Sequence, residues 1–275
     1  MKILITGGSG YVARNLTRLF QSTNHTVTSP SKSELNLLEC DDIKYFINET
    51  SPDVVIHTAI RGGERINKDG YDIAWENIYM YDNLMSYVSD TTKVIVFGSG
   101  AEFDRRSDID CEKEEHVTLR NPIDLYGKSK NTISRKILNS NRDIYLLRLF
   151  AGFNYDEEPY RFVKQCITNI KTDNPIEIHQ NRMMDFFYMD DIFKVINHIL
   201  CHDSCKHMNL VYQKKHSLSD IVNMILRITN QPNYPTVING ENGLSYTGDG
   251  SKLADLKLQF TGLYNGLAET CKSLL

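Results

Sequence analysis

A tyrosine and a lysine four residues apart, Tyr126 and Lys130, carry the clearest chemical signal in this sequence of 275 residues. On a helix, this spacing places both side chains on one face. A lysine ammonium beside a phenol lowers the phenol's pKa, so the tyrosine can exchange a proton with a carbonyl or an alcohol near neutral pH. Ser99 follows the apolar run Lys93–Phe97, and its hydroxyl can hydrogen-bond the same oxygen. The three residues predict acid–base chemistry at a carbonyl or alcohol.

A glycine-rich turn near the start of the chain is typical of a phosphate-binding loop. It reads Thr6-Gly7-Gly8-Ser9-Gly10-Tyr11-Val12-Ala13 and lies between a strand-like run and a helical pattern. Gly7 allows a sharp turn, Gly10 lets the backbone approach a pyrophosphate, and Ala13 is small enough for close helix–strand packing. The helix N-terminus adds amide donors and partial positive charge. The turn therefore predicts a bound dinucleotide.

The end of the second expected strand favours NADP(H) over NAD(H). An NAD enzyme usually has an acid there that binds the ribose 2′-hydroxyl. This chain has Thr28-Ser29-Pro30-Ser31-Lys32 instead, with no carboxylate before Glu34. Hydroxyls and the Lys32 ammonium suit a 2′-phosphate better than an acid would. NAD(H) stays open as the alternative.

Apolar runs alternate with helical patterns through the first 150 residues. Strands are expected at Lys2–Thr6, His25–Thr28, Asp53–Thr58, Lys93–Phe97 and Asp143–Phe150, and helices at Val12–Gln21, Cys40–Thr50, within Tyr71–Val88 and at Tyr126–Leu138. This alternation implies βαβ crossovers and a mostly parallel sheet covered on both faces. The predicted fold class is α/β, a Rossmann-type doubly wound parallel sheet. Ligands bind such sheets outside the carboxyl ends of the strands, where Ser99 and Tyr126 are expected.

The alternation loosens in the second half of the chain. We expect a dinucleotide-binding Rossmann domain over residues 1–150 and a smaller C-terminal substrate-binding lobe over residues 151–275, part of which returns to the first domain. Helices are expected at Arg161–Thr172 and Ser217–Asn230, and a strand at Pro175–His179. The acidic run Asp108–Glu115 is expected to be a solvated loop over the active site. Asp190 and Asp191 are expected to cap the helix that follows them.

Composition excludes several functional classes. A net charge of −4 and a pI of about 6.1 give no electrostatic footprint for nucleic acid, and no apolar run is long enough to cross a bilayer. The chain starts with a strand-like run and no signal peptide, so a cytoplasmic protein with reduced thiols is expected. Cys201 and Cys205, with His202 and His207 nearby, invite a metal site. No second ligand pair follows at zinc spacing, so we expect no metal.

Taken together, the phosphate loop, Ser99 and the pair Tyr126/Lys130 resemble the extended short-chain dehydrogenases/reductases, the NAD-dependent epimerase/dehydratase family. The resemblance covers nearly the whole chain. Within the family, the chain is most similar to the GDP-fucose synthases, which are NADP-dependent GDP-4-keto-6-deoxymannose epimerase/reductases. This similarity rests on Ser33–Glu39, Arg61-Gly62-Gly63, Gly98-Ser99 before Phe103, Asp185–Asp191 and Gly266-Leu267.

The resemblance implies which residues contact the cofactor and the substrate. The implied cofactor contacts are Gly7, Ser9, Gly10, Tyr11, Val12, Lys32, Asn36, Leu37, Thr58, Ala59, Ile60, Tyr126, Lys130 and Phe150. The implied catalytic residues are Ser99, Tyr126 and Lys130, and the substrate contacts are Ser99, Gly100, Tyr126, Arg161 and Arg182. Arg161 and Arg182 are candidates for the substrate diphosphate, since guanidinium groups bind phosphate oxygens well; a solvated surface arginine is the alternative for each. The resemblance also implies a homodimer, formed by the helices within Tyr71–Val88 and Tyr126–Leu138.

Departures from the family pattern narrow the expected chemistry. Nucleotide-sugar dehydratases carry an Asp-Glu pair directly after the serine, where this chain has Gly100 and Ala101. GDP-fucose synthases epimerise with a cysteine two residues beyond the serine, which is Ala101 here, and with a histidine whose place falls near Tyr160-Arg161. Hydride transfer remains. We therefore expect an NADP(H)-dependent reductase of a 4-keto-6-deoxy nucleotide sugar, in which Tyr126 donates the proton.

Substrate-side departures leave other hypotheses open. Ala151 stands where the family usually has an asparagine, and Met184 where it has an arginine, so the sugar or its nucleotide can differ from the usual one. One alternative is a nucleotide-sugar epimerase with tightly bound NAD. Another is a non-catalytic dinucleotide-binding regulator, against which the intact Ser99, Tyr126 and Lys130 argue.

Overall fold

The computed structural model describes residues 1–63 and 70–275, and the chain divides into two compact units. The first unit comprises Met1–Asp104, Lys113–Arg148 and Cys205–Met208. The second comprises Arg105–Glu112, Leu149–Ser204 and Asn209–Leu275. The chain therefore leaves the first unit for a short excursion, at Arg105, long before its main exit after Arg148.

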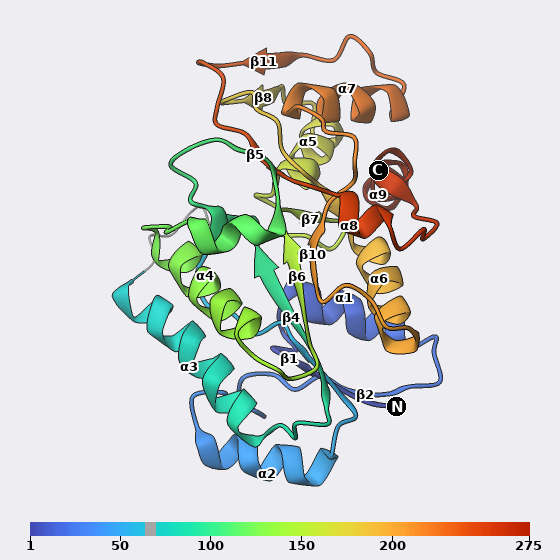
Figure 1. The fold of residues 1–275 in the computed structure, drawn as a ribbon. Coiled ribbons are helices and arrows are strands. Elements are labelled where there is room, and N and C mark those ends of the chain that lie inside the picture. Colours follow the sequence, from blue (N-terminus) through green and yellow to red (C-terminus); the bar gives the residue numbers. More distant parts are fainter. Residues whose placement is uncertain (64–69) are drawn as a thin grey trace. The chain divides into compact units, whose positions relative to one another are not determined.

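A six-stranded sheet is the framework of the first unit within the described ranges (Figure 1). Its strands are β1 (Lys2–Thr6), β2 (Thr26–Thr28), β3 (Val54–His57), β4 (Lys93–Ser99), β6 (Ile144–Leu149) and β10 (His207–Leu210), in the order β10-β6-β4-β3-β1-β2. β1 pairs in parallel with β2 and β3, and β3 pairs in parallel with β4. Because β2 and β3 flank β1 on opposite sides, the winding reverses there, and this reversal is where doubly wound sheets bind ligands. The α/β doubly wound fold is thus confirmed.

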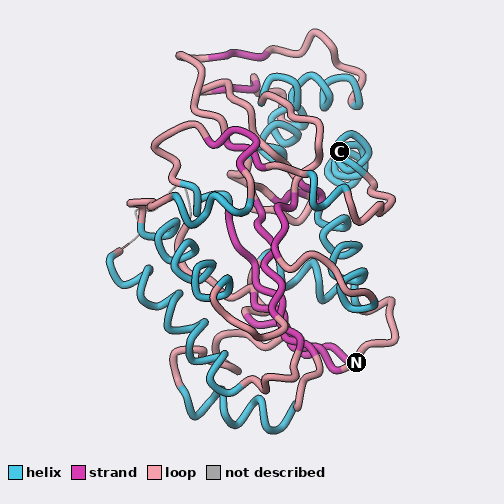
Figure 2. Tube along the Cα trace, in the orientation of Figure 1, coloured by secondary structure: helices cyan, strands magenta, loops and turns pink. Residues whose placement is uncertain are grey.

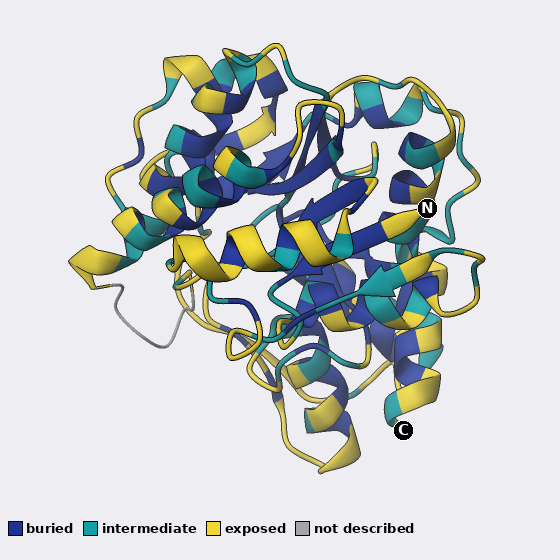
Figure 3. Cartoon of the chain, turned by 90° about the horizontal axis from the view of Figure 1, so that it is seen from below, coloured by how far each residue is buried: buried dark blue, intermediate teal, exposed yellow. Residues whose placement is uncertain are grey.

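Helices cover both faces of this sheet. On one face lie α2 (Cys40–Thr50), α3 (Tyr71–Tyr87) and α4 (Leu125–Leu138), whose buried Ile43, Leu84 and Ile133 share a core with apolar residues of β3 and β4. On the other face lies α1 (Tyr11–Phe20), with Leu16 and Phe20 fully buried. Figure 2 shows the helices flanking the strands, and Figure 3 shows the inner strands of the sheet buried, whereas the edge strand β2 is partly exposed. The continuous apolar strands and the helices with a 3.6-residue apolar period thus find the apolar partners that they need.

The second unit is built from short paired strands and five helices within the described residues. Three pairs form: β5 (Ile109–Glu112) with β12 (Tyr246–Gly248), β7 (Gly152–Phe153) with β9 (Phe187–Tyr188), and β8 (Ile176–Ile178) with β11 (Thr236–Ile238). The helices are α5 (Phe162–Lys171), α6 (Met189–Cys201), α7 (Leu218–Ile228), α8 (Ser251–Ala254) and α9 (Gly262–Leu274). Its core contains Phe153, Ile167, Ile225 and Leu267, from four different elements.

The expected strands and helices are confirmed, with ends within two residues of those predicted. The expectation of a solvated loop over Asp108–Glu115 is wrong. That segment contains β5 and the start of the 3₁₀ helix η2 (Glu114–Leu119), and Glu112 and Glu114 are buried. Its partner strand β12 lies far along the chain, so the local charge pattern does not report the pairing.

The expected capping role of Asp190 and Asp191 is also wrong. Both lie inside the first turn of α6, which begins at Met189. The buried Asp191 carboxylate instead accepts hydrogen bonds from the amides of Thr261, at 2.8 Å, and Gly262, at 2.9 Å. It therefore stabilises the N-terminus of α9, a helix distant in sequence. In the described ranges, no helix combines the length and the apolar character that a membrane crossing requires.

Candidate active site

The turn between β1 and α1 has the shape of a phosphate cradle. Gly7 has a φ of +74°, and a Cβ there would lie 2.7 Å from the Cα of Ala59. A Cβ on Gly8 would lie 2.2 Å from the carbonyl oxygen of Ser29. Glycine is required at both places because backbone from two neighbouring turns closes around the loop. Within the described chain no side chain caps α1 at Gly10, and its first turn holds no acid, so the amides there suit an anionic pyrophosphate.

The turn after β2 contains charges of both signs. The Glu34 carboxylate accepts hydrogen bonds from the amide and the hydroxyl of Ser31, both at 2.8 Å, and these bonds lower the pKa of Glu34. Lys32 lies between them in the sequence. The Glu34 carboxylate, which lies six residues beyond β2 in the sequence, therefore turns back toward the end of β2. A 2′-phosphate and a 2′-hydroxyl would each find a group of suitable charge in this turn.

The Ser99 side chain lies at the end of β4 and begins the 3₁₀ helix η1 (Gly100–Phe103). Its Oγ accepts a hydrogen bond from the amide of Ala101 at 3.2 Å, and the Glu102 carboxylate accepts one from the Ser99 amide at 2.8 Å. This reciprocal capping box fixes the serine rotamer. No acceptor for the Ser99 hydroxyl is found among the described residues, so its O–H is available to donate to a substrate oxygen.

Helix α4 carries Tyr126 and Lys130 one turn apart. Asp124 caps the helix by accepting a hydrogen bond from the Gly127 amide at 2.7 Å. Lys130 is buried, and its Nζ donates to the carbonyl oxygen of Phe97 at 2.6 Å. Burial lowers the pKa of Lys130 to about 8, against the opposing influence of the Glu102 carboxylate. The lysine is thereby anchored to β4, the same strand that presents Ser99.

A loop after β3 approaches the Tyr126 ring closely at Gly63. Gly63 has a φ of +77°, and a Cβ there would lie 2.8 Å from two ring carbons of Tyr126. The loop is held by Asn77 of α3, which accepts a hydrogen bond from the Arg61 amide at 2.8 Å and donates one to the Arg61 carbonyl at 2.9 Å. The Arg61-Gly62-Gly63 motif therefore shapes the surroundings of Tyr126.

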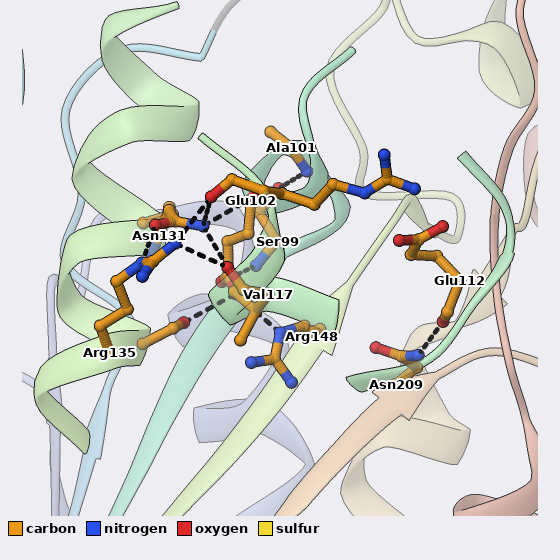
Figure 4. A network of polar contacts seen from close by, with 12 residues as sticks. Ser99, Ala101, Glu102, Glu112, Val117, Asn131, Arg135, Arg148 and Asn209 are labelled. Atoms are coloured by element: carbon orange, nitrogen blue, oxygen red, sulfur yellow. Dashed lines mark hydrogen bonds and ion pairs between the residues drawn. The ribbon is translucent and has the colours of Figure 1, made fainter. Parts of the chain in front are cut away.

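Sequence reasoning missed a buried ion pair behind Ser99 (Figure 4). Glu102 and Arg148 are both fully buried, with 2.7 Å between Oε2 and Nε. The sequence did contain a signal. Arg148 interrupts the apolar run Ile144–Leu149, and a charge inside a buried strand needs a partner of opposite sign.

The remaining cofactor candidates of the first unit lie in the turns that follow β1, β2 and β3. They are Ser9, Asn36, Leu37, Thr58 and Ile60, while Tyr11 and Val12 are the first two residues of α1. The Thr58 hydroxyl donates to the carbonyl oxygen of Thr6 at 2.7 Å, which ties two of these turns together. Gly100 follows Ser99 as the first residue of η1 and is buried. The first unit thus brings together the phosphate cradle and the three catalytic candidates.

Three candidates belong to the second unit. Phe150 packs edge-on against the Tyr246 ring, with 5.1 Å between centroids. Arg161 is ion-paired with Glu158, with 2.7 Å between Nε and Oε2. Arg182 is partly buried, burial lowers its pKa, and its Nε has no hydrogen-bond partner in the described chain. Arg182 therefore offers an anion a buried donor that has no partner among the described residues.

The described residues hold no group of three or more histidine, cysteine or acidic side chains that could bind a metal ion. Cys201 and Cys205 are exposed free thiols.

Comparison with known proteins places this geometry in a family. The NAD-dependent epimerase/dehydratase family model matches residues 3–211. GDP-L-colitose synthase of Yersinia pseudotuberculosis is 29% identical over 149 residues, which are 52% of this chain and 48% of that protein. Methionine adenosyltransferase 2 subunit beta of Mus musculus is 26% identical over 157 residues, which are 54% of this chain and 46% of that protein. The matched region spans about half the length of these curated relatives.

A solved structure shares the fold over nearly the full length. GDP-mannoheptose C4 reductase from Campylobacter jejuni, with NADP bound, superposes with a TM-score of 0.80 at 18% identity, covering 98% of this chain and 97% of that one. The resemblance expected from the loop, the serine and the Tyr126/Lys130 pair is therefore confirmed. The chain belongs to the NAD-dependent epimerase/dehydratase family.

Proposed function

We propose that this protein is an NADP(H)-dependent reductase of nucleotide-linked keto sugars, with 4-keto-6-deoxy sugars as the substrate class. The observation that carries the proposal is the joint placement of Ser99, Tyr126 and Lys130 in the unit that holds the phosphate cradle. Two matched proteins are named as a GDP-sugar synthase and a GDP-sugar C4 reductase, in support of this substrate class.

The chemistry follows from the three side chains. A nicotinamide cofactor, when bound at the turn Gly7–Gly10, supplies the hydride. Ser99 donates its free O–H to the carbonyl oxygen of the substrate and polarises that carbonyl. Tyr126 transfers its phenolic proton to the same oxygen as the alcohol forms. The Lys130 ammonium, held on the Phe97 carbonyl, stabilises the phenolate left behind.

The turn after Ser99 supports reduction without epimerisation or dehydration. Gly100 and Ala101 hold the two places where related enzymes carry acid–base groups, and both are buried. The Ala101 carbonyl lies so close to Gly127 that a Cβ on that glycine would approach it to 2.6 Å. Glycine and alanine have no side chain that could transfer a proton at the sugar ring, and the close packing at Ala101 leaves little room for a larger residue.

The cofactor preference for NADP(H) rests on Lys32 in the turn after β2. The Campylobacter jejuni neighbour, which binds NADP, is consistent with that preference. Glu34 opposes it, because its carboxylate would repel a 2′-phosphate. The preference is measured directly as the ratio of kcat/KM for NADPH to that for NADH, and a ratio below one would contradict it.

We assign substrate binding to the second unit, with Arg161 and Arg182 as the ligands of the substrate diphosphate.

We also propose that the protein is a homodimer formed through α3 and α4. Tyr71, Trp75 and Tyr79 form one exposed stripe on α3, at 87%, 61% and 54% relative exposure. Such an aromatic stripe is typical of a buried helix interface. A solution mass of one chain, 31.6 kDa, would contradict this assignment.

A second candidate function comes from another class. The mouse relative is named as a subunit of methionine adenosyltransferase 2, which favours a dinucleotide-binding subunit as the alternative. A nucleotide-sugar epimerase with tightly bound NAD is the alternative within the enzyme class. The three hypotheses differ in turnover: only the reductase consumes NADPH, and only the epimerase converts substrate without added nicotinamide.

The test follows NADPH oxidation at its near-ultraviolet absorbance band. The substrates are 4-keto-6-deoxy sugars carried on GDP, dTDP, UDP and CDP, and NADH is run in parallel. We expect turnover with one nucleotide and a loss of about a thousandfold or more in kcat for Tyr126→Phe, which cannot donate the proton. Equal rates for wild type and Tyr126→Phe would sink the reductase proposal. Absence of turnover together with copurifying NAD would favour the epimerase.

A further inference from the structure

Glu102 is the meeting point of three elements of the first unit. Its Oε1 accepts a hydrogen bond from the amide of Ser99 at 2.8 Å, at the end of β4. Its Oε2 accepts from the Ser134 hydroxyl of α4 and from Arg148 Nε of β6, both at 2.7 Å. Its backbone carbonyl accepts from the Asn131 side chain of α4 at 2.9 Å. Figure 4 shows Ser99, Asn131 and Arg148 converging on it.

These contacts bracket the proposed catalytic residues. Ser99 is tied to Glu102 directly. Ser134 lies one helical turn beyond Lys130, and Asn131 is its immediate neighbour, so two bonds from α4 fix the helix that carries Tyr126 and Lys130. Any displacement of the Glu102 carboxylate would therefore change the spacing between the serine and the Tyr126/Lys130 pair.

The backbone is shaped to admit this carboxylate. A Cβ on Gly98 would lie 2.5 Å from Glu102 Oε1 and 2.9 Å from Arg148 Cγ. Gly98 has no unusual φ. Glycine is thus required at position 98 because a side chain would collide with the Glu102–Arg148 pair. The backbone conformation of Gly98 does not itself require glycine.

The Glu102–Arg148 pair is expected to contribute little net stability to the folded state. Both side chains are fully buried, and Arg148 Nη1 and Nη2 have no hydrogen-bond partner in the described chain, although the Phe103 ring lies 5.7 Å from Cζ. Desolvating two charges costs several kcal/mol per ion, and apolar replacements of buried pairs are often neutral or stabilising. A buried pair with unused donors points to a role other than stability.

Electrostatics link the same carboxylate to the lysine. Burial weakens the charged form of Lys130, and Glu102 opposes that effect. Two further titratable groups bear on Lys130: Tyr126, one turn before it on α4, and His57, which burial and the lysine charge keep neutral, with a pKa of about 3. Glu102 is thus a negative charge that supports the Lys130 ammonium, and Arg148 is the cation paired with the same carboxylate.

We propose that Glu102 is a positioning residue of the active site: held by Arg148, its buried carboxylate locks the Ser99 turn to helix α4 and supports the charge of Lys130. The inference rests on the proposed reductase function and deepens it. Glu102 touches neither substrate nor cofactor in this role. It sets where the three catalytic residues lie and keeps one of them charged.

The experiment compares three variants. Glu102→Gln keeps the shape and removes the charge, Glu102→Asp keeps the charge and shortens its reach, and Glu102→Gln/Arg148→Met removes both charges. We expect kcat to fall by about tenfold to a hundredfold in Glu102→Gln, with KM for NADPH within about threefold, because misplacement by about 1 Å can cost a hundredfold. The alkaline limb of the kcat profile should move to lower pH in Glu102→Gln and stay near its wild-type position in Glu102→Asp.

The double variant separates positioning from folding. Removing both charges should restore thermal stability, while kcat and the pH profile stay at the values of Glu102→Gln. Recovery of kcat along with stability would overturn the proposal. Arg142→Met is the matched control, since Arg142 donates to three backbone carbonyls at the other end of the sheet. It should lower the melting temperature without changing kcat or the pH profile.

A substrate-independent readout keeps this proposal distinct from the reductase assignment. The ionisation of Lys130 can be followed by side-chain amine NMR in the cofactor-free protein, with Lys130→Arg identifying the signal. Its midpoint should fall in Glu102→Gln, and an unchanged midpoint would overturn the electrostatic part. A fallen midpoint in a protein that reduces none of the keto sugars would uphold Glu102's influence and reject the reductase function.

Discussion

Glu102 of the first unit differs from Glu157 and Asp185 of the second in how fully its buried charge is matched. In the first unit, the Glu102 carboxylate is matched by a cation and by two neutral donors. In the second unit, burial raises the pKa of Glu157 to about 8 and that of Asp185 to about 6, the latter against an opposing ion pair with Lys215. Arg182 in the same unit has a buried Nε with no hydrogen-bond partner among the residues that the structure describes.

Fully paired and incompletely paired carboxyl groups suit different kinds of function. A saturated carboxylate rigidifies its surroundings, which suits chemistry that depends on fixed spacing. Incompletely matched charges remain available to a ligand, and such shifted groups cluster at functional sites. We therefore expect substitutions in the first unit to change the chemical step and those in the second unit to change substrate affinity.

The largest expected difference is in the free energy of unfolding, compared for one glycine-to-alanine substitution in each unit. Gly98→Ala drives a Cβ into the buried ion pair and should lower the free energy of unfolding by about 3 kcal/mol. Gly262→Ala meets no atom within 4 Å in the described chain, and its φ of +80° costs about 1 kcal/mol for a residue with a side chain. Urea denaturation measures both, and equal losses would contradict the contrast.

A second prediction concerns Glu157, the carboxyl group of the second unit whose ionised form is disfavoured by burial. Its pKa in the folded protein, about 8, lies above the ordinary 4.5, so the folded state binds the proton more tightly than the unfolded state does. The associated stability is complete below the unfolded pKa and is lost as the pH rises toward 8. Glu157→Gln keeps an acceptor for the Lys164 amide and should be more stable than wild type by about 2 kcal/mol at pH 8, with little difference near pH 4.5.

Melting temperatures between pH 4.5 and pH 8 give the comparison. Glu158→Gln serves as the control, since Glu158 is a partly exposed partner of Arg161. A wild type and a Glu157→Gln variant with parallel pH profiles would show that this carboxyl is not strained.

The smallest expected effect is on substrate affinity. Arg182→Gln should raise KM for the nucleotide sugar by about tenfold and leave kcat within about twofold, because a charge-assisted bond to a phosphate is lost in ground state and transition state alike. Arg182→Lys should recover part of the loss, and Lys164→Gln in the same unit should have little effect. A fall in kcat at constant KM would place Arg182 with the catalytic residues instead.

Much of the first unit was predictable because its signals are local. The glycine turn, the apolar strands and the four-residue spacing of Tyr126 and Lys130 each depend on neighbours within one turn or one strand. Backbone sterics and side-chain periodicity act over that range, so the fold class and the catalytic candidates follow from the sequence. The departures at Gly100 and Ala101 were equally visible.

Long-range pairing decided the rest. The acidic segment near Glu112 became a strand because β12 lies beside it, and Asp191 became the cap of α9 because that helix starts next to it. Glu102 gained its role from Arg148, 46 residues away along the chain. The free-energy cost of burying a charge depends on the partners that the folded chain brings within hydrogen-bond distance. Those partners are distant in sequence, so a local sequence pattern does not identify them.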